Sequence, residues 1–176
     1  MGTLVGVPAR ERPELLAEPV RKALDARPDA DIYVVEIDPE LADTAQFCAA
    51  YDVPPEISAN CVVVAGRRGG EQRVAACMVL ATTRADVNNV VKRRLDVRKA
   101  SFLPMDEAVL ATDMEYGGIT PIGLPADWPV LVDPAVAELP FAVIGSGVRR
   151  SKLALPGATL AGWPGAEIVD GLARPV

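Results

Sequence analysis

Two long apolar segments separated by a short turn sequence constrain the fold of this chain more than any other feature. Residues 57–65 and 73–82 are rich in Val, Ala and Cys, and Arg67-Arg68-Gly69-Gly70 lies between them. Long β-branched runs on either side of a Gly-Gly pair predict a β-hairpin. Both faces of each strand are apolar, so we expect the hairpin near the middle of a sheet that is covered on both sides.

Short strands and short helices are expected along the rest of the chain. The expected strands span residues 31–37, 99–103, 129–133, 141–145, 151–155 and 167–169. Apolar residues at helical spacing predict helices at residues 13–26, 85–95, 105–112 and 156–163. Asp43 and Gln46 form a capping-box pattern that opens a further helix, which ends at Val53-Pro54-Pro55. The pattern predicts a single α/β domain of the α+β kind over residues 1–176, with the helix at 13–26 packed on it.

Composition excludes several classes of protein. Half of the residues are hydrophobic and 5% are aromatic, which is typical of a folded mixed domain and not of a disordered chain. No apolar run reaches the roughly 18 residues that a membrane-spanning helix needs. The first residues lack the basic and apolar regions of a secretory signal, so we expect a cytoplasmic protein.

The chain contains no histidine, which excludes Ser-His and Cys-His nucleophile pairs and His-ligated metals. Cys48, Cys61 and Cys77 are spaced by 13 and 16 residues, which matches no zinc or disulfide framework. Cys61 and Cys77 lie in Val-rich runs, so we expect buried, reduced thiols. Any proton transfer must use a carboxylate, Lys, Tyr, a thiol, water or a group of the substrate.

Charge is distributed unevenly in a chain whose net charge is −6. Residues 67–99 carry 9 basic and 3 acidic groups, whereas residues 1–66 carry 5 and 12 and residues 100–176 carry 4 and 9. A basic segment in an acidic chain is compatible with a phosphate-facing surface and equally with a solvated helix face.

The segment Tyr116–Gly123, with the sequence YGGITPIG, combines four Gly or Pro residues with apolar side chains. A surface linker would be polar. The composition therefore predicts a rigid loop held against a core, with bare backbone available to approach a ligand.

These segments, taken in order, resemble the YbaK/EbsC family, the domain associated with prolyl-tRNA synthetase editing. The resemblance extends from Asp31 to the C-terminus. It rests on residues 58–64, 73–80, 97–102 with 106–108, 116–123 and 143–155. It implies a YbaK-like mixed, antiparallel-rich, strongly curved sheet flanked by helices.

The resemblance also implies a function. Family members act in trans as aminoacyl-tRNA deacylases that hydrolyse the ester of a mischarged tRNA, including alanyl- or cysteinyl-tRNA. The expected partners are the aminoacylated tRNA 3′ end and an aminoacyl-tRNA synthetase; no membrane, DNA, metal or organic cofactor is expected. Two alternatives remain open: a catalytically weakened tRNA- or synthetase-binding module of the same fold, and a binding protein for a nucleotide or an amino acid.

The resemblance places Asn60, Gly117 and Gly118 at the centre of the chemistry. The loop N–H groups are expected to bind the carbonyl oxygen or the terminal adenosine. The family usually carries a lysine where this chain has Asn60, a neutral amide with two donors and one acceptor. Three explanations stay open: Asn60 binds the substrate by hydrogen bonds, Lys99 or Lys152 supplies the missing cation, or hydrolysis has been lost.

Further residues are assigned to binding by the same resemblance. The expected substrate-binding residues are Tyr116, Ile119, Thr120, Pro121, Gly123, Asp133, Ser146 and Gly147. The expected contacts to the tRNA backbone are Arg93, Arg94, Arg98 and Lys99. Asp133 alternatively begins the turn at Pro134, Tyr116 alternatively lies at the edge of the core, and Asn60 alternatively bonds the local backbone.

Overall fold

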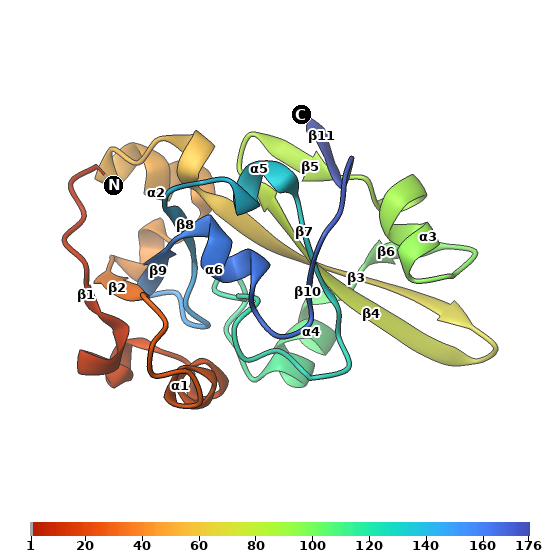
Figure 1. Cartoon of the computed structure of the whole chain (residues 1–176), viewed down its shortest axis with the longest axis horizontal. Helices are drawn as coiled ribbons and strands as arrows, with labels where there is room; N and C mark the ends of the chain where they lie inside the picture. Colours follow the sequence, from red (N-terminus) through yellow and green to blue (C-terminus); the bar gives the residue numbers. More distant parts are fainter. Residues whose placement is uncertain (1) are drawn as a thin grey trace.

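The predicted hairpin forms the longest element of the fold in the computed structural model, which describes residues 2–176 (Figure 1). Strands β3 (Ala59–Arg68) and β4 (Glu71–Leu80) pair antiparallel along their full lengths. Gly69 and Gly70 have φ values of 60° and 87°, which suit a two-residue turn that matches the twist of the strands. Arg67 and Arg68 therefore belong to the end of β3 and not, as expected, to the turn.

A five-stranded sheet has the order β10-β7-β4-β3-β6, with the hairpin inside it as expected. Its other strands are β6 (Ala100–Phe102), β7 (Val130–Val132) and β10 (Ala166–Ile168). Strand β7 runs parallel to both β4 and β10, whereas β3 pairs antiparallel with β4 and β6. The sheet is thus mixed.

A second, four-stranded sheet is antiparallel throughout and has the order β1-β2-β9-β8. It consists of β1 (Val7–Pro8), β2 (Tyr33–Glu36), β8 (Ala142–Gly145) and β9 (Ser151–Leu155). The two sheets meet where β3 begins, because Ser58 forms a parallel bridge with Val143. The mixed, antiparallel-rich fold is confirmed. A separate pair, β5 (Thr83–Ala85) with β11 (Ala173–Pro175), was not predicted.

Both faces of the hairpin are covered, which explains its continuous apolar sequence. Val64 packs in one cluster with Val87 and Val91, which belong to the π-helical turn η5 (Val87–Val91) that leads into α3 (Lys92–Arg94). Its neighbour Val63 packs in a different cluster with Ala108 of α4 (Met105–Thr112). Successive residues of a strand point to opposite faces, so η5–α3 and α4 lie on opposite sides of the sheet.

The helix expected at 13–26 is shorter than predicted. Residues Pro13–Leu15 form a 3-10 turn, Ala17 is extended, and only Glu18–Asp25 form α1. Pro19 is the cause, because its ring lacks an N–H and would clash with the carbonyl four residues earlier in a continuing helix. The helix nevertheless packs on the main core through Val20 and Leu24.

The helix predicted from Asp43 spans Thr44–Tyr51 (α2), but its capping box is absent. Asp43 is the N-cap residue, and its side chain makes no capping hydrogen bond. The helix predicted at 105–112 is confirmed, the one at 156–163 is shorter (α6, Gly157–Ala161), and α5 (Pro134–Ala137) was not predicted. Within residues 2–176, none of the helices has the length and apolar character needed to cross a membrane.

Candidate functional site

A cavity of about 380 Å³ lies at the junction of the two sheets. Its walls come from the beginnings of β3 and α2, from the segment between β6 and α4, from the Tyr116–Ile119 part of the Gly-Pro loop, and from β8 and β9. The lining residues used below are Asp43, Thr44, Asn60, Cys61, Phe102, Tyr116, Gly117, Ile119 and Lys152.

One wall of the cavity is a stretch of β3 without a strand partner on one edge. β3 pairs with β6 only from Val64 onward, and its other neighbour on that edge, β8, reaches it only at Ser58. The carbonyl of Val63 accepts a hydrogen bond from the N–H of Leu103 at 2.9 Å, so Val63 directs its backbone toward this edge. Backbone groups alternate along a strand, and Cys61 therefore directs its N–H and C=O to the same edge, where the cavity lies.

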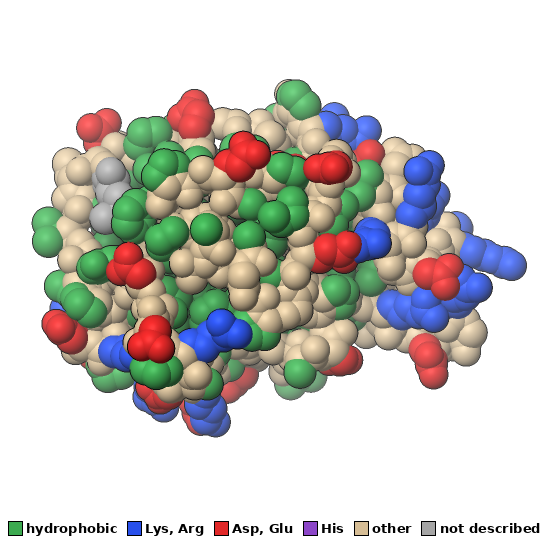
Figure 2. Space-filling model, viewed as in Figure 1, with side chains coloured by type: hydrophobic (Ala, Val, Ile, Leu, Met, Phe, Trp, Pro, Cys, Tyr) green, Lys and Arg blue, Asp and Glu red, His purple; other side chains and the backbone are tan. Residues whose placement is uncertain are grey.

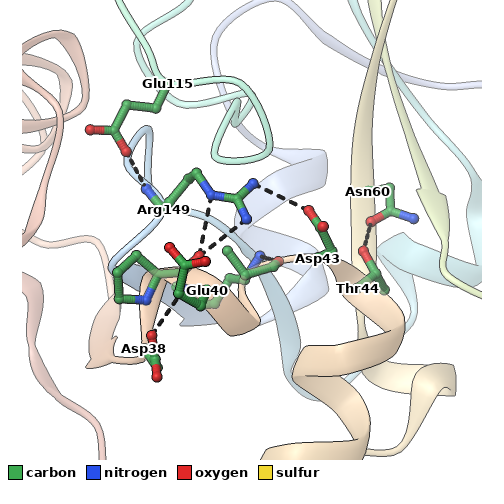
Figure 3. A network of polar contacts seen from close by, with 10 residues as sticks. Asp38, Glu40, Asp43, Thr44, Asn60, Glu115 and Arg149 are labelled. Atoms are coloured by element: carbon green, nitrogen blue, oxygen red, sulfur yellow. Dashed lines mark hydrogen bonds and ion pairs between the residues drawn. The ribbon is translucent and has the colours of Figure 1, made fainter.

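Asn60 lies beside this edge and is half-buried. Its Oδ1 accepts a hydrogen bond from the hydroxyl of Thr44 at 2.8 Å (Figure 3). Its amide N–H groups have no hydrogen-bond partner among residues 2–176. The Thr44 contact therefore fixes the orientation of the amide and leaves its donors available to a ligand.

Lys152 of β9 is a nearly buried ammonium group that is 8% exposed. Its Nζ donates to the carbonyl of Ala42 at 2.8 Å and lies 5.2 Å from the centre of the Phe47 ring. No carboxylate lies within 4 Å of it in the described part of the chain. Burial, with a smaller contribution from the nearby Arg149, lowers the pKa of Lys152 from 10.5 to about 8.

Arg149 connects the start of α2 to the loop that precedes Tyr116 (Figure 3). Its Nε and Nη2 donate to the carbonyl of Pro39 at 3.2 and 3.1 Å, and its Nη1 lies 3.2 Å from Asp43 Oδ1. Its backbone N–H donates to Glu115 Oε2 at 2.6 Å. This network explains the missing capping box, because Arg149 draws the Asp43 carboxylate away from the helix N–H groups.

The two glycines assigned to catalysis occupy different environments. Gly117 is exposed, has φ 83° and lines the cavity, and a Cβ there would lie 2.5 Å from Arg149 Nη1. Gly118 is buried, and a Cβ there would lie 2.8 Å from the backbone carbonyl of Val148. Its own carbonyl accepts the N–H of Gly147 at 2.7 Å. Gly117 therefore faces the cavity, whereas Gly118 permits close contact between two backbone segments.

The remaining loop residues also separate into those that line the cavity and those that do not. Tyr116 and Ile119 line the cavity. Thr120 is fully buried, and its hydroxyl has no hydrogen-bond partner among the described residues. Pro121 and Gly123 line a different cavity, of about 300 Å³, which also contains Trp128 and Trp163.

Three further residues assigned to substrate binding lie outside the 380 Å³ cavity. Ser146 is buried, and its hydroxyl is 2.7 Å from that of Ser151. A Cβ at Gly147 would lie 2.4 Å from the Cβ of Ala17, so this glycine permits the packing of the segment before α1. Asp133 caps α5, since its Oδ1 accepts the N–H of Ala135 and its Oδ2 that of Ala173, both at 3.0 Å. The structure thus gives Asp133 the turn role that the sequence left as an alternative.

The basic segment lies at the other end of β3 from the cavity. Arg93, Arg94, Arg98 and Lys99 are exposed. Figure 2 shows Lys and Arg side chains gathered at the end of the molecule where the hairpin tip and α3 lie. Arg94 forms an ion pair with Glu167. Of the two cations considered as replacements for the family lysine, only Lys152 lines the cavity.

The thiols are protonated at neutral pH. Burial raises the pKa of Cys77 to about 12 and also raises the pKa values of Cys61 and Cys48. Cys61 is half-buried and lines the cavity, which corrects the expectation that it is fully buried. Its raised pKa argues against a thiolate nucleophile. Within residues 2–176, no group of three or more Cys, Asp and Glu side chains is placed to hold a metal ion.

Comparisons with known proteins identify a domain family and similar folds. Residues 38–162 match the aminoacyl-tRNA editing domain. A crystal structure of a candidate trans-editing enzyme for prolyl-tRNA synthetase aligns with a TM-score of 0.74 at 20% identity, covering 88% of this chain and 94% of that one. A hypothetical protein aligns with a TM-score of 0.77 at 18% identity, covering 89% of this chain and all (100%) of the other. No curated protein sequence matches the chain significantly.

Proposed function

The chain belongs to the aminoacyl-tRNA editing domain family, and we propose that it acts in trans as a deacylase that hydrolyses the ester bond of a mischarged tRNA. The observation that carries this proposal is the convergence of hydrogen-bond donors on one cavity. The open edge of β3, the amide of Asn60, the backbone at Gly117 and the ammonium of Lys152 all line the 380 Å³ space. These groups come from separate segments of the chain, and the fold brings them together at this cavity.

Ester hydrolysis suits this set of groups. Water attacks the acyl carbonyl carbon, the carbonyl oxygen becomes an oxyanion, and the ribose oxygen leaves with a proton. Backbone N–H groups of the β3 edge and the Asn60 amide can donate to the oxyanion, and such donors typically contribute about 10²–10³ in rate. The vicinal ribose hydroxyl of the substrate supplies a proton-transfer group that the histidine-free chain lacks.

The proposed arrangement of the tRNA follows from the shape of β3. The cavity lies at Cys61, and the basic end of the hairpin lies at Arg68. Seven residues of strand correspond to about 23 Å. In the proposed complex the 3′ end enters the cavity, while Arg93, Arg98 and Lys99 contact phosphates of the acceptor stem.

The test is a deacylation assay over a panel of charged tRNAs, beginning with Ala-, Cys-, Ser-, Thr- and Pro-tRNA. We expect at least one ester to be hydrolysed faster than in buffer. Asn60→Ala should slow this hydrolysis by about 10²-fold if the amide binds the oxyanion, whereas Asn88→Ala, at an exposed asparagine, should have no effect.

An Asn60→Lys variant separates the proposal from the alternative of a catalytically weakened binding module. A large rise in hydrolysis over a negligible wild-type rate would favour the binding module. Asn88→Lys is the matched control, because it adds the same charge at a surface position.

Docking of the tRNA is tested by its dependence on salt. Each phosphate contact that is lost reduces the slope of log affinity against log salt by about one. Replacing Arg93, Arg98 and Lys99 together by Gln should therefore lower both the affinity and this slope. An affinity that is equal at low and high salt in the parent protein would exclude this surface as the docking site.

A further inference from the structure

The buried cation that lines the cavity has no ion-pair partner among the described residues. Lys152 is the buried cation, and the charged groups that influence it are Arg149 and Asp43. Asp43 is already paired with Arg149 at 3.2 Å. Lys152 therefore has no carboxylate paired with it within 4 Å among residues 2–176.

The hydrogen bonds of Lys152 are also incomplete. An ammonium group has three donors. Among residues 2–176 only the carbonyl of Ala42 accepts one of them, and the Phe47 ring offers a weaker contact. A buried charge without a counter-ion is costly unless it is compensated, so a ligand that brings an anionic oxygen would be bound favourably here.

The depth of Lys152 limits what this anion can be. Lys152 is 8% exposed, whereas Tyr116 and Phe102 of the cavity lining are 56% and 64% exposed. A phosphodiester is substituted on two sides and continues into the chain on both, so it suits an open surface. A carboxylate at the end of a short side chain can reach a nearly buried group.

We propose that the acyl group accepted by this cavity carries a carboxylate side chain, as in an aspartyl or glutamyl ester, and that Lys152 binds this carboxylate. The proposal rests on the editing function proposed above and names its substrate class. The free N–H groups of Asn60 line the same cavity and offer a second donor to the carboxylate.

Binding of hydrolysis-resistant analogues tests this inference without requiring catalysis. The probes are adenosines with aspartyl, asparaginyl, glutamyl or glutaminyl groups joined to the 3′ position through an amide. Within each pair the acidic and the amide side chain have nearly the same shape and differ in charge. Titration calorimetry on the full chain should show that at least one acidic analogue binds about tenfold or more tightly than its amide counterpart.

The Lys152→Gln variant should lose this preference and bind the amide analogues about as well as the parent does. Gln is polar and only one atom shorter than Lys, so the variant removes the charge with limited disturbance of packing. Lys22→Gln is the control, because Lys22 is an exposed partner of Glu18 on α1. Circular dichroism establishes that each variant is folded.

Equal or tighter binding of the amide analogues would overturn the inference, as would a preference that survives in Lys152→Gln or a lack of binding by all four probes. The deacylation panel, extended to Asp- and Glu-tRNA, distinguishes this failure from that of the proposed function. Hydrolysis of neutral esters alone would retain the editing function and reject the carboxylate. Tight binding of the acidic analogues without hydrolysis of any ester would retain the carboxylate specificity and reject the editing function.

Discussion

The two walls of the cavity differ in whether contacts within the protein account for the residue types found there. On the loop side, the surroundings within the protein account for the glycines: Gly118 lies against the backbone of Val148, and Gly117 leaves room for Arg149. On the β3–β9 side, packing accounts for neither Asn60 nor Lys152. Asn60 keeps unused donors, and Lys152 keeps a buried charge without a counter-ion in the described residues.

The difference indicates which groups are available to a ligand. The loop residues stabilise the shape of the cavity, whereas the unsatisfied groups of the opposite wall have bonding capacity left over. Substitutions on the loop side should therefore reduce stability, and substitutions on the β3–β9 side should alter binding with smaller or pH-dependent effects on stability. The following predictions test this division.

The largest effect is expected for Gly118→Ala. Its Cβ would lie 2.8 Å from backbone atoms of Val148, which cannot move as the end of a flexible side chain can. We expect the free energy of unfolding to fall by about 3 kcal/mol, measured by urea denaturation. Gly162→Ala is the control, because a Cβ there would lie at an ordinary 3.4 Å from its nearest neighbour. Equal stability of the two variants would contradict the packing role of Gly118.

Lys152→Met should change how stability depends on pH. The pKa of Lys152 is about 8 in the folded protein and 10.5 in the unfolded chain, so the unfolded chain binds more protons between these values. The stability of the parent should therefore rise with pH relative to the variant, by about 3 kcal/mol between pH 7.5 and 10.5. This relative gain develops between the two pKa values: it is nearly complete above pH 10.5 and nearly absent below pH 8.

Urea denaturation at several pH values measures this difference. In Lys22→Met, which removes an exposed lysine, the curve should run parallel to that of the parent. A parallel curve for Lys152→Met as well would mean that the buried ammonium does not titrate as its surroundings imply.

Gly117→Ala should cost less than Gly118→Ala. Its φ of 83° disfavours a Cβ by about 1 kcal/mol, and its nearest neighbour is the end of the Arg149 side chain, which can move. Gly69→Ala is the control that measures backbone strain without a steric clash, because Gly69 has φ 60° and no atom lies within 4 Å of a Cβ there. Similar losses in unfolding free energy are expected for the two. A loss for Gly117→Ala as large as that for Gly118→Ala would place Gly117 in the packed part of the loop.

The smallest effect on stability is expected for Thr44→Val. It removes the hydrogen bond to Asn60 Oδ1 in a half-buried position, and the unfolding free energy should fall by about 0.5–1 kcal/mol. Binding of the adenosine analogues should weaken more clearly, because the Asn60 amide loses its fixed orientation. Thr82→Val, at an exposed threonine, is the control. Unchanged analogue binding would show that the Thr44 contact does not position Asn60.

Local sequence patterns predicted most of the strands. The hairpin, β7 and β8 lie where apolar and β-branched content placed them, because this content reflects burial within a sheet. The sequence was less reliable for the ends of the helices, which depend on single residues and on side chains from elsewhere in the chain. The start of α1 is displaced by Pro19, and the capping function of Asp43 is lost to Arg149, a residue 106 positions away.

The candidate site was predicted in part. Asn60, Gly117, Tyr116 and Ile119 were expected to bind substrate, and the structure brings them to one cavity. Asp133, Ser146, Gly147 and Thr120 lie elsewhere. Nothing in the sequence pointed to Thr44, Phe102 or Arg149, because each reaches the site through packing between segments that are far apart in the chain.

The sequence by itself determined the central hairpin, the absence of any histidine chemistry and the Gly- and Pro-rich, apolar character of the Tyr116–Gly123 loop, since residue type and local spacing control these properties. Only the tertiary structure decided that this loop divides into a cavity-facing and a packed part, and that Lys152 and not Lys99 lines the cavity together with Asn60. The physical reason is that burial and charge pairing depend on which distant segments meet. The junction of two sheets, formed by Ser58 and Val143, brings those segments together.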